Sequence, residues 1–143
     1  MVKETFQELY HNRVALEGMV LKPNMAIAGK KSSKRAGVDE VAEKTVRLLK
    51  ACVPGAVPGI AFLSGGQSDE EATAHLDAMN RIGNLPWKLT FSYGRALQHA
   101  PQKAWSGKSE NVAAAQRAFS HRARMNSLAS LGQWKSDLEK KAA

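Results

Sequence analysis

The chain repeats one pattern three times: a short apolar segment, a loop, and a segment with the apolar spacing of a helix. The apolar segments are residues 13–21, 60–63 and 87–92, each ended by turn residues or a proline. Segments of this kind are typical of strands, and strands that alternate with helices favour a parallel sheet. The pattern therefore predicts an α/β fold with three parallel strands and flanking helices.

The segments between and after these strands carry helix signals. Residues 38–52 have an apolar stripe at helical spacing and acidic residues in the first turn, as the helix dipole prefers. Ser68 and Glu71 match the capping box that opens a helix. Pro101 is expected to kink or split the helix around it. Helices are predicted at residues 3–12, 38–52, 68–81, 96–105 and 111–131, and the polar tail 135–143 is expected to fray.

Length and composition indicate a globular protein. A chain of 143 residues with 43% hydrophobic content can form one domain with a sizeable core, so residues 1–143 are expected to be a single domain. No apolar run approaches the ~20 residues that span a bilayer, and no signal peptide is expected. The single Cys52 excludes an internal disulfide and favours a cytoplasmic location.

The formal net charge of +8 suggests an anionic ligand or partner. Most basic residues are dispersed, and the one cluster consists of Lys30, Lys31, Lys34 and Arg35. Aromatic residues make up only 6% of the chain, which leaves few side chains on which bases could stack. A phosphorylated small molecule, or an acidic remainder of a larger protein, therefore ranks above nucleic acid as the partner.

Three residues stand directly after the predicted strands: Lys22, Ser64 and Arg95. The carboxyl ends of parallel strands meet at one edge of the sheet, where ligands bind. By alternation, Lys22 shares a face with Val20, so it is expected to point inward and to be desolvated. Desolvation favours the free amine, which can attack a carbonyl and form an imine. A structural or surface lysine is the commoner meaning of a lone Lys-Pro pair.

Ser64, Gly65 and Gly66 form a turn in which backbone N–H groups can approach an anion closely, because glycine has no Cβ. The helix predicted from Ser68 directs its positive end to the same place. A phosphate suits this turn, and a plain tight turn before a capped helix is the alternative.

Arg95, which follows Gly94, could hold the same phosphate with a bidentate fork, and Ser92 could add a hydroxyl. The alternatives are a surface ion pair for the arginine and a backbone contact for the serine. No metal site, cofactor or serine–histidine–acid arrangement is expected, because the four histidines do not cluster. The histidines are His11, His75, His99 and His121, and His75 is expected to pack on a helix face.

Residues 16–25, 57–68 and 89–98, in this order and spacing, resemble stretches of class I fructose-1,6-bisphosphate aldolases. The resemblance covers almost the whole chain but only the C-terminal part of the family, less than half of it. It implies a partial (β/α)₈ TIM barrel, of which ~250 residues are typical when complete.

The resemblance implies that Lys22 forms the imine and that the substrate phosphate is held by other residues of the same edge. It implies reversible cleavage of fructose 1,6-bisphosphate to dihydroxyacetone phosphate and glyceraldehyde 3-phosphate, without metal. Family members are cytosolic or plastid enzymes of glycolysis and gluconeogenesis and commonly form tetramers, so the full-length enzyme is expected to be a homo-oligomer. The implied phosphate ligands are Ser64, Gly65, Gly66, Ser92, Gly94 and Arg95.

The family's acid–base glutamate lies on earlier strands and has no counterpart here, and Glu17 stands too early on its strand to replace it. The family's C-terminal tyrosine also has no match. The expectation is therefore a metal-independent aldolase fragment that is weak or inactive alone. The alternative is a non-catalytic phosphate-binding or interaction module derived from an aldolase.

Overall fold

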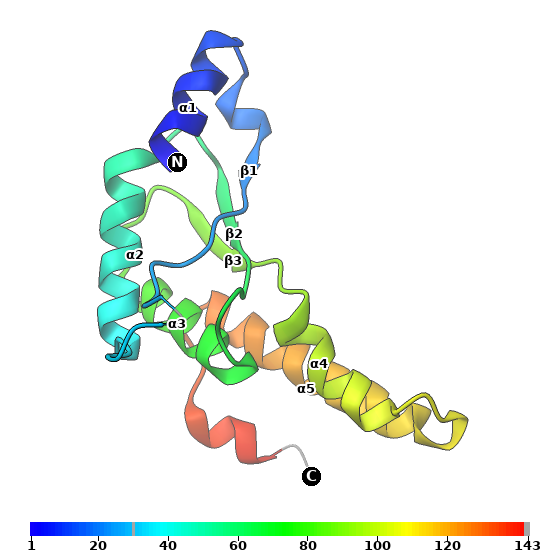
Figure 1. Cartoon of the computed structure of the whole chain (residues 1–143). Coiled ribbons are helices and arrows are strands. Elements are labelled where there is room, and N and C mark those ends of the chain that lie inside the picture. The colour runs from blue at the N-terminus through cyan, green and yellow to red at the C-terminus, as the bar shows by residue number, and fades with distance from the viewer. Residues whose placement is uncertain (30, 142–143) are drawn as a thin grey trace.

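A parallel sheet is at the centre of the structure, a computed structural model that describes residues 1–29 and 31–141 (Figure 1). Its three strands follow the order β1–β2–β3, which confirms the predicted α/β fold with parallel strands. Lys30 of the predicted basic cluster and residues 142–143 of the predicted tail lie outside the described residues. The strands are β1 (Val20–Leu21), β2 (Gly59–Phe62) and β3 (Lys88–Phe91).

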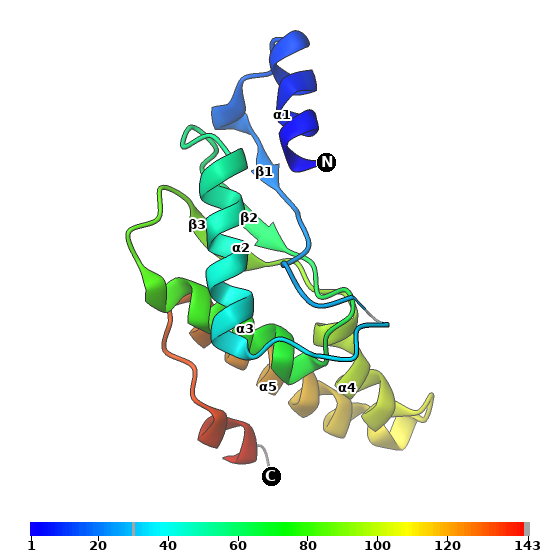
Figure 2. The ribbon, with the colours of Figure 1, turned by 60° about the vertical axis from the view of Figure 1, so that its left-hand side comes forward.

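Helices cover one face of the sheet, and two further helices extend beyond its end. Figures 1 and 2 show α2 and α3 beside the sheet, while α4 and α5 form a hairpin that runs outward from its end. Within the described part of the chain, no helix is long and apolar enough to cross a membrane. The helices are α1 (Val2–His11), α2 (Val38–Cys52), α3 (Asp69–Ile82), α4 (Arg95–Trp105) and α5 (Val112–Ser130), with 3₁₀ turns at Leu16–Gly18, Ser109–Asn111 and Ser136–Lys141.

The two faces of the sheet are very different. Register pairs Ile60 with Leu21 on one side and with Leu89 on the other, so these apolar side chains share one face. That face packs into the core with the buried residues of α2 and α3. The opposite face is bare: Val20, which pairs with Gly59, is 63% exposed.

Local signals for the helices are largely confirmed. Ser68 Oγ accepts a hydrogen bond from the Glu71 backbone N–H at 3.1 Å, and the Glu71 carboxylate accepts one from the Ser68 N–H at 2.8 Å. This is the predicted capping box, and it satisfies two donors that a helix start leaves free. Pro101 does not split its helix, because α4 continues through this residue to Trp105.

The strand predicted at 13–21 is wrong over most of its length. Only Val20 and Leu21 pair with a neighbour, and a 3₁₀ turn occupies Leu16–Gly18. The reason is the partner: β2 begins at Gly59, opposite Val20, and the residue before Gly59 is a proline, which cannot donate to a ladder. Residues before Val20 therefore have no strand to pair with.

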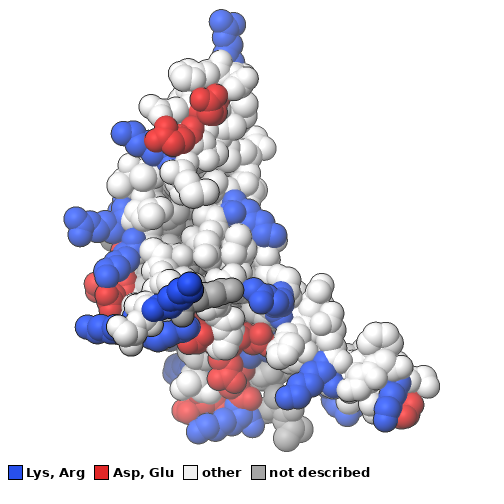
Figure 3. All heavy atoms as spheres, viewed as in Figure 1, with Lys and Arg blue, Asp and Glu red and all other residues white. Residues whose placement is uncertain are grey.

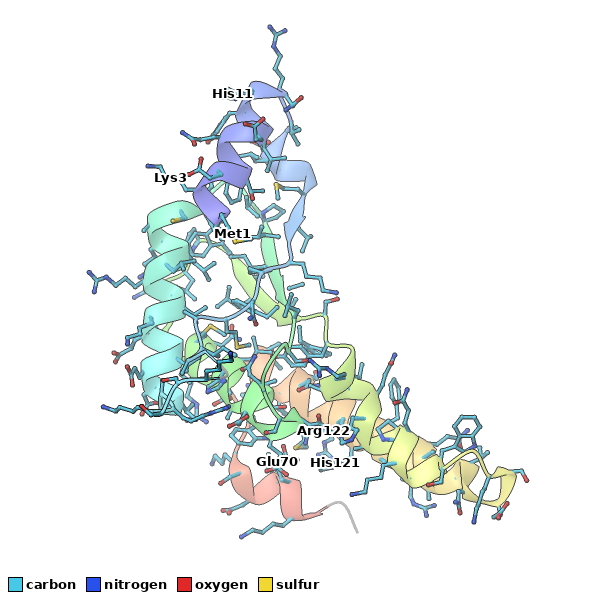
Figure 4. All side chains as sticks on the ribbon, in the orientation of Figure 1. Met1, Lys3, His11, Glu70, His121 and Arg122 are labelled. Carbon is cyan, nitrogen blue, oxygen red and sulfur yellow. The ribbon has the colours of Figure 1, made fainter. Side chains whose placement is uncertain are left out.

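The expectation that the polar tail frays is wrong for residues 136–141, which form a 3₁₀ turn docked on α5. Glu139 accepts hydrogen bonds from Arg122 Nη1 at 2.5 Å and from Trp134 Nε1 at 2.9 Å, and His121 Nε2 lies 3.0 Å from its carboxylate. Figure 4 shows His121 and Arg122 on the part of α5 that lies above the C-terminal turn. We call these four residues, Arg122, His121, Trp134 and Glu139, the C-terminal clasp. Their partners lie 5 to 18 positions apart in sequence, so local propensity does not reveal them.

We expect this chain, when isolated, to self-associate. Strands β1 and β3 each pair on one side only among the described residues, and the bare face exposes Val20. Unpaired edges beside apolar surface favour association with further strands. Analytical ultracentrifugation across a concentration series should show oligomers, and Val20→Glu should weaken them. A monomeric chain that melts cooperatively at every concentration would contradict this expectation.

Candidate active site

Backbone hydrogen bonds beyond the strand ends draw the three predicted site segments to one edge of the sheet. The N–H of Leu63 donates to the Pro23 carbonyl at 3.1 Å, and the N–H of Ser92 donates to the Phe62 carbonyl at 2.8 Å. These bonds continue the ladder past the last paired residues. The segments that carry Lys22, Ser64 and Arg95 therefore leave the sheet at its carboxyl edge, side by side.

Lys22 is exposed, although alternation predicts a buried lysine. Its side chain is exposed, as is that of Lys88, another residue of the bare face. The predicted face is consistent with the structure, because Lys22 stands two residues after Val20 and both residues are exposed. The mistaken step is the assumption that this face is covered, since nothing within the described residues packs on it.

The loop after β2 is closely packed at its glycines. Gly66 has φ +82°, a backbone conformation that residues with a side chain rarely adopt. A Cβ there would lie 3.0 Å from Ile27 Cδ1. A Cβ on Gly65 would lie 3.0 Å from Leu63 Cδ1. Both positions therefore favour glycine.

Ser64 links this loop to the one after β3. Its side chain is only 6% exposed, and its Oγ accepts a hydrogen bond from the Ala96 N–H at 3.4 Å. Ala96 belongs to the first turn of α4, so the start of that helix is held against Ser64. The starts of α3 and α4 thus both lie at the carboxyl edge, where their positive dipole ends favour an anion.

The predicted residues on the third segment border open space. Ser92, Gly94 and Arg95 are all exposed. Arg95 also lines a cavity of about 460 Å³ between the starts of α3 and α4. Its lining residues are Gln67, Ser68, Asp69, Glu70, Arg95 and His99.

One contact at this edge was not foreseen. The prediction that His75 packs on a helix face is confirmed, as it is 5% exposed, but its ring also contacts the Gln67 side chain, with Nδ1 2.6 Å from Oε1. The two lie eight positions apart in sequence, and Gln67 precedes α3 while His75 lies within it, so the period of a single element does not relate them. The sequence could predict this contact only if the backbone conformation of the turn at Gly66 were known.

Charged side chains of both signs share the face of the molecule seen in Figure 3. Figure 3 shows Lys and Arg side chains scattered over the viewed face, with acidic side chains between them. Arg35, from the predicted cluster, lies 3.7 Å from Glu71, and Lys44 pairs with Glu40 at 2.6 Å. Among the residues with assigned positions, no three His, Cys, Asp or Glu side chains come together as a metal site would require.

The fold and this edge define the class of protein. Three parallel strand–helix units with a glycine loop and two helix starts at the carboxyl edge form part of a (β/α)₈ barrel. The family model for fructose-bisphosphate aldolase class I matches residues 1–143. The chain belongs to the class I fructose-bisphosphate aldolase family.

A bacterial relative and a plant relative agree with this assignment. A probable fructose-bisphosphate aldolase class 1 of Xanthomonas campestris pv. campestris is 53% identical over 135 residues, 94% of this chain and 40% of the relative. The cytosolic fructose-bisphosphate aldolase 4 of Arabidopsis thaliana is 52% identical over 94% of this chain and 34% of its own length.

A solved structure gives the same result for the fold. The fructose-bisphosphate aldolase of Plasmodium falciparum, in a ternary co-crystal with TRAP and a small-molecule inhibitor, matches with a TM-score of 0.92 and 48% identity. The match covers 94% of this chain and 39% of that one. This chain therefore spans about two-fifths of the length of the proteins it resembles.

Proposed function

We propose that this chain supplies the imine-forming and phosphate-binding part of a fructose-bisphosphate aldolase. The activity of the whole enzyme would be reversible cleavage of fructose 1,6-bisphosphate to dihydroxyacetone phosphate and glyceraldehyde 3-phosphate. The observation that carries the proposal is the shared carboxyl edge from which Lys22, Ser64 and Arg95 all emerge. The proposal includes a single domain over residues 1–143, a cytoplasmic location and a homo-oligomer for the full-length enzyme.

In this proposal Lys22 provides the covalent step. Its Nζ, as the free amine, attacks the carbonyl carbon of dihydroxyacetone phosphate, and the carbonyl oxygen leaves as water. In the cleavage direction, the protonated C=N group formed from the ketose accepts the electron pair of the carbon–carbon bond that breaks. The exposure of Lys22 leaves Nζ accessible to a substrate that approaches the bare face of the sheet.

The phosphate would bind between the loops that follow β2 and β3. Because Gly65 and Gly66 have no Cβ, their backbone N–H groups can approach it closely, and Ser64 joins the two loops through Ala96. Arg95 adds a planar fork that suits two phosphate oxygens. Ser92 and Gly94 complete the proposed set from the β3 side.

The proposed chemistry of this chain alone ends at the imine. Glu17, the carboxylate nearest to Lys22 in sequence, belongs to the 3₁₀ turn before β1, at the other end of that strand. It is therefore poorly placed to move a proton at the carboxyl edge. We propose that this chain alone binds substrate and forms the imine with weak turnover or none.

A non-catalytic phosphate-binding module is the second candidate. The observation that favours it is the contrast between a packed glycine loop and an exposed Lys22, since an exposed lysine lacks the desolvation that promotes imine formation. The two candidates differ in one respect: only the first forms a covalent adduct with dihydroxyacetone phosphate.

Phosphate binding is tested through Arg95. Arg95→Met should weaken binding of inorganic phosphate about 10- to 100-fold, because a hydrogen bond to a charged group contributes about 1.5–3 kcal/mol. Titration followed by backbone amide chemical shifts reports both affinity and location. Lys103→Met, an exposed change on the same helix with the same loss of charge, is the matched control and should leave binding within about twofold. If both variants bound phosphate equally weakly, net charge would explain the loss of affinity, and a specific role for Arg95 would be excluded.

A further inference from the structure

A single short hydrogen bond ties the end of the glycine loop to the body of α3. Gln67 directly follows Gly66, and its Oε1 lies 2.6 Å from Nδ1 of His75. Because an amide oxygen only accepts, Nδ1 carries the proton and donates it. His75 is 5% exposed in the second turn of α3, so its ring is largely shielded from competing water.

We propose that Gln67 and His75 are positioning residues that hold the Ser64–Gln67 loop in its phosphate-binding shape. The inference rests on the proposed function, since it concerns the same phosphate. Neither side chain needs to touch the ligand. The pair acts through the backbone, by fixing the end of the loop that begins at Ser64.

The loop needs such an anchor because of its glycines. Gly65 and Gly66 carry more conformational freedom in the absence of constraints than any other pair of residues. The bond that closes the turn, from the Gln67 N–H to the Ser64 carbonyl, is long at 3.3 Å. The side-chain bond to His75 is much shorter, so it is the stronger restraint on where Gln67 lies.

An unsatisfied donor at Gln67 supports the same conclusion. Its Nε2 is buried and has no hydrogen-bond partner among the described residues. A buried donor without a partner costs about 1–3 kcal/mol, which an apolar side chain of similar size would avoid. Glutamine at this position is therefore explained by its oxygen, which His75 engages.

The state of the His75 ring suits a permanent anchor. Burial lowers the pKa of His75, Glu71 opposes that shift, and Arg35 adds to it. The ring is therefore neutral at pH 7, with its one N–H committed to Gln67. In the neutral ring, Nε2 remains an acceptor, so the bond to Gln67 uses the only donor available.

The test measures affinity for inorganic phosphate in the full chain. His75→Leu and Gln67→Met should each weaken binding about 2- to 10-fold, because one net hydrogen bond contributes about 0.5–1.5 kcal/mol. The double variant should be no worse than either single variant, as a coupled pair requires. His75→Asn, which keeps an N–H donor, should recover most of the affinity. His11→Leu, on exposed α1, is the matched control and should bind as the wild type does.

Backbone amide shifts of Gly65 and Gly66, read beside thermal unfolding, separate positioning from simple destabilisation. Altered glycine shifts, weaker binding and rescue by His75→Asn would support the pair. If His75→Leu does not fold, Gln67→Met supplies the loss of the contact and His75→Asn the conservative comparison. A wild type that binds no phosphate would overturn the proposed function and this inference together. A wild type that binds phosphate, with Gln67→Met and every folded His75 variant binding it as tightly as the wild type does, would overturn the inference alone.

Discussion

Lys22→Met should abolish the covalent adduct that forms when the chain is incubated with dihydroxyacetone phosphate and reduced with borohydride. Reduction delivers hydride to the imine carbon and leaves a stable secondary amine, so each trapped imine adds a fixed mass to the protein. Methionine has no amine and cannot form this bond. Intact-mass spectrometry should show one addition for the wild type and none above background for Lys22→Met.

Lys88→Met is the matched control for this experiment. Lys88 is an exposed lysine at the start of β3, and register places it beside Gly59 and so on the same bare face as Val20. It stands at the amino end of its strand, away from the glycine loop, and its loss should leave the adduct intact. Because both lysines are exposed, neither change should alter the free energy of unfolding by more than about 0.5 kcal/mol. Equal adduct formation by wild type and Lys22→Met would exclude Lys22 as the reacting amine.

Glu139→Gln should be strongly destabilising. Its side chain is 9% exposed and faces the 5% exposed Arg122, so the change leaves a buried guanidinium without its counter-ion. Removal of one partner from such a pair costs about 3 kcal/mol, or a fall in Tm of roughly 10 °C. Urea unfolding and calorimetry should both show the loss.

The exposed pair Glu40–Lys44 provides the contrast. Its oxygen and nitrogen lie 2.6 Å apart, but its side chains are 46% and 63% exposed. Glu40→Gln should therefore change the free energy of unfolding by no more than about 0.5 kcal/mol. Similar effects of Glu40→Gln and Glu139→Gln would contradict the burial argument.

Acid should remove the difference between wild type and Glu139→Gln. Burial acts to raise the pKa of Glu139, but hydrogen bonds from Trp134, Arg122 and His121 outweigh it and hold the pKa below 4.5. A carboxylate with a lowered pKa adds stability that is fully present above its unfolded pKa and is lost as the pH falls through the folded one. The gap between the two proteins should therefore be constant near pH 7 and shrink below pH 4.5.

Most of the fold could be predicted because its elements have local signals. The capping box at Ser68 and the turn residues around Ile60 define their elements within a few positions. Strand β1 lacked such a boundary at its start, since its length depends on where β2 begins to pair. The clasp around Glu139 was missed for a related reason: its partners come from α5 and from Trp134, and only the folded chain brings them together.

The sequence was enough to predict which edge of the sheet carries the site, but not how exposed its residues are or what they contact. Carboxyl ends of parallel strands meet at one edge, so the positions of Lys22, Ser64 and Arg95 in sequence indicate their common edge. The exposure of Lys22 could not be read from alternation, because alternation gives the face of a residue and not what covers that face. The contact between Gln67 and His75 depends on the exact path of two glycines, which no periodicity encodes.

The most direct test of the central claim combines adduct mapping with an activity assay on one preparation of the wild-type chain. One portion is trapped with dihydroxyacetone phosphate and borohydride and digested for peptide mapping. The other is assayed for release of glyceraldehyde 3-phosphate from fructose 1,6-bisphosphate. We predict one adduct, on the peptide that contains Lys22, and little or no cleavage. No adduct, or adducts spread over exposed lysines such as Lys88 and Lys103, would contradict an imine site at the carboxyl edge of this sheet.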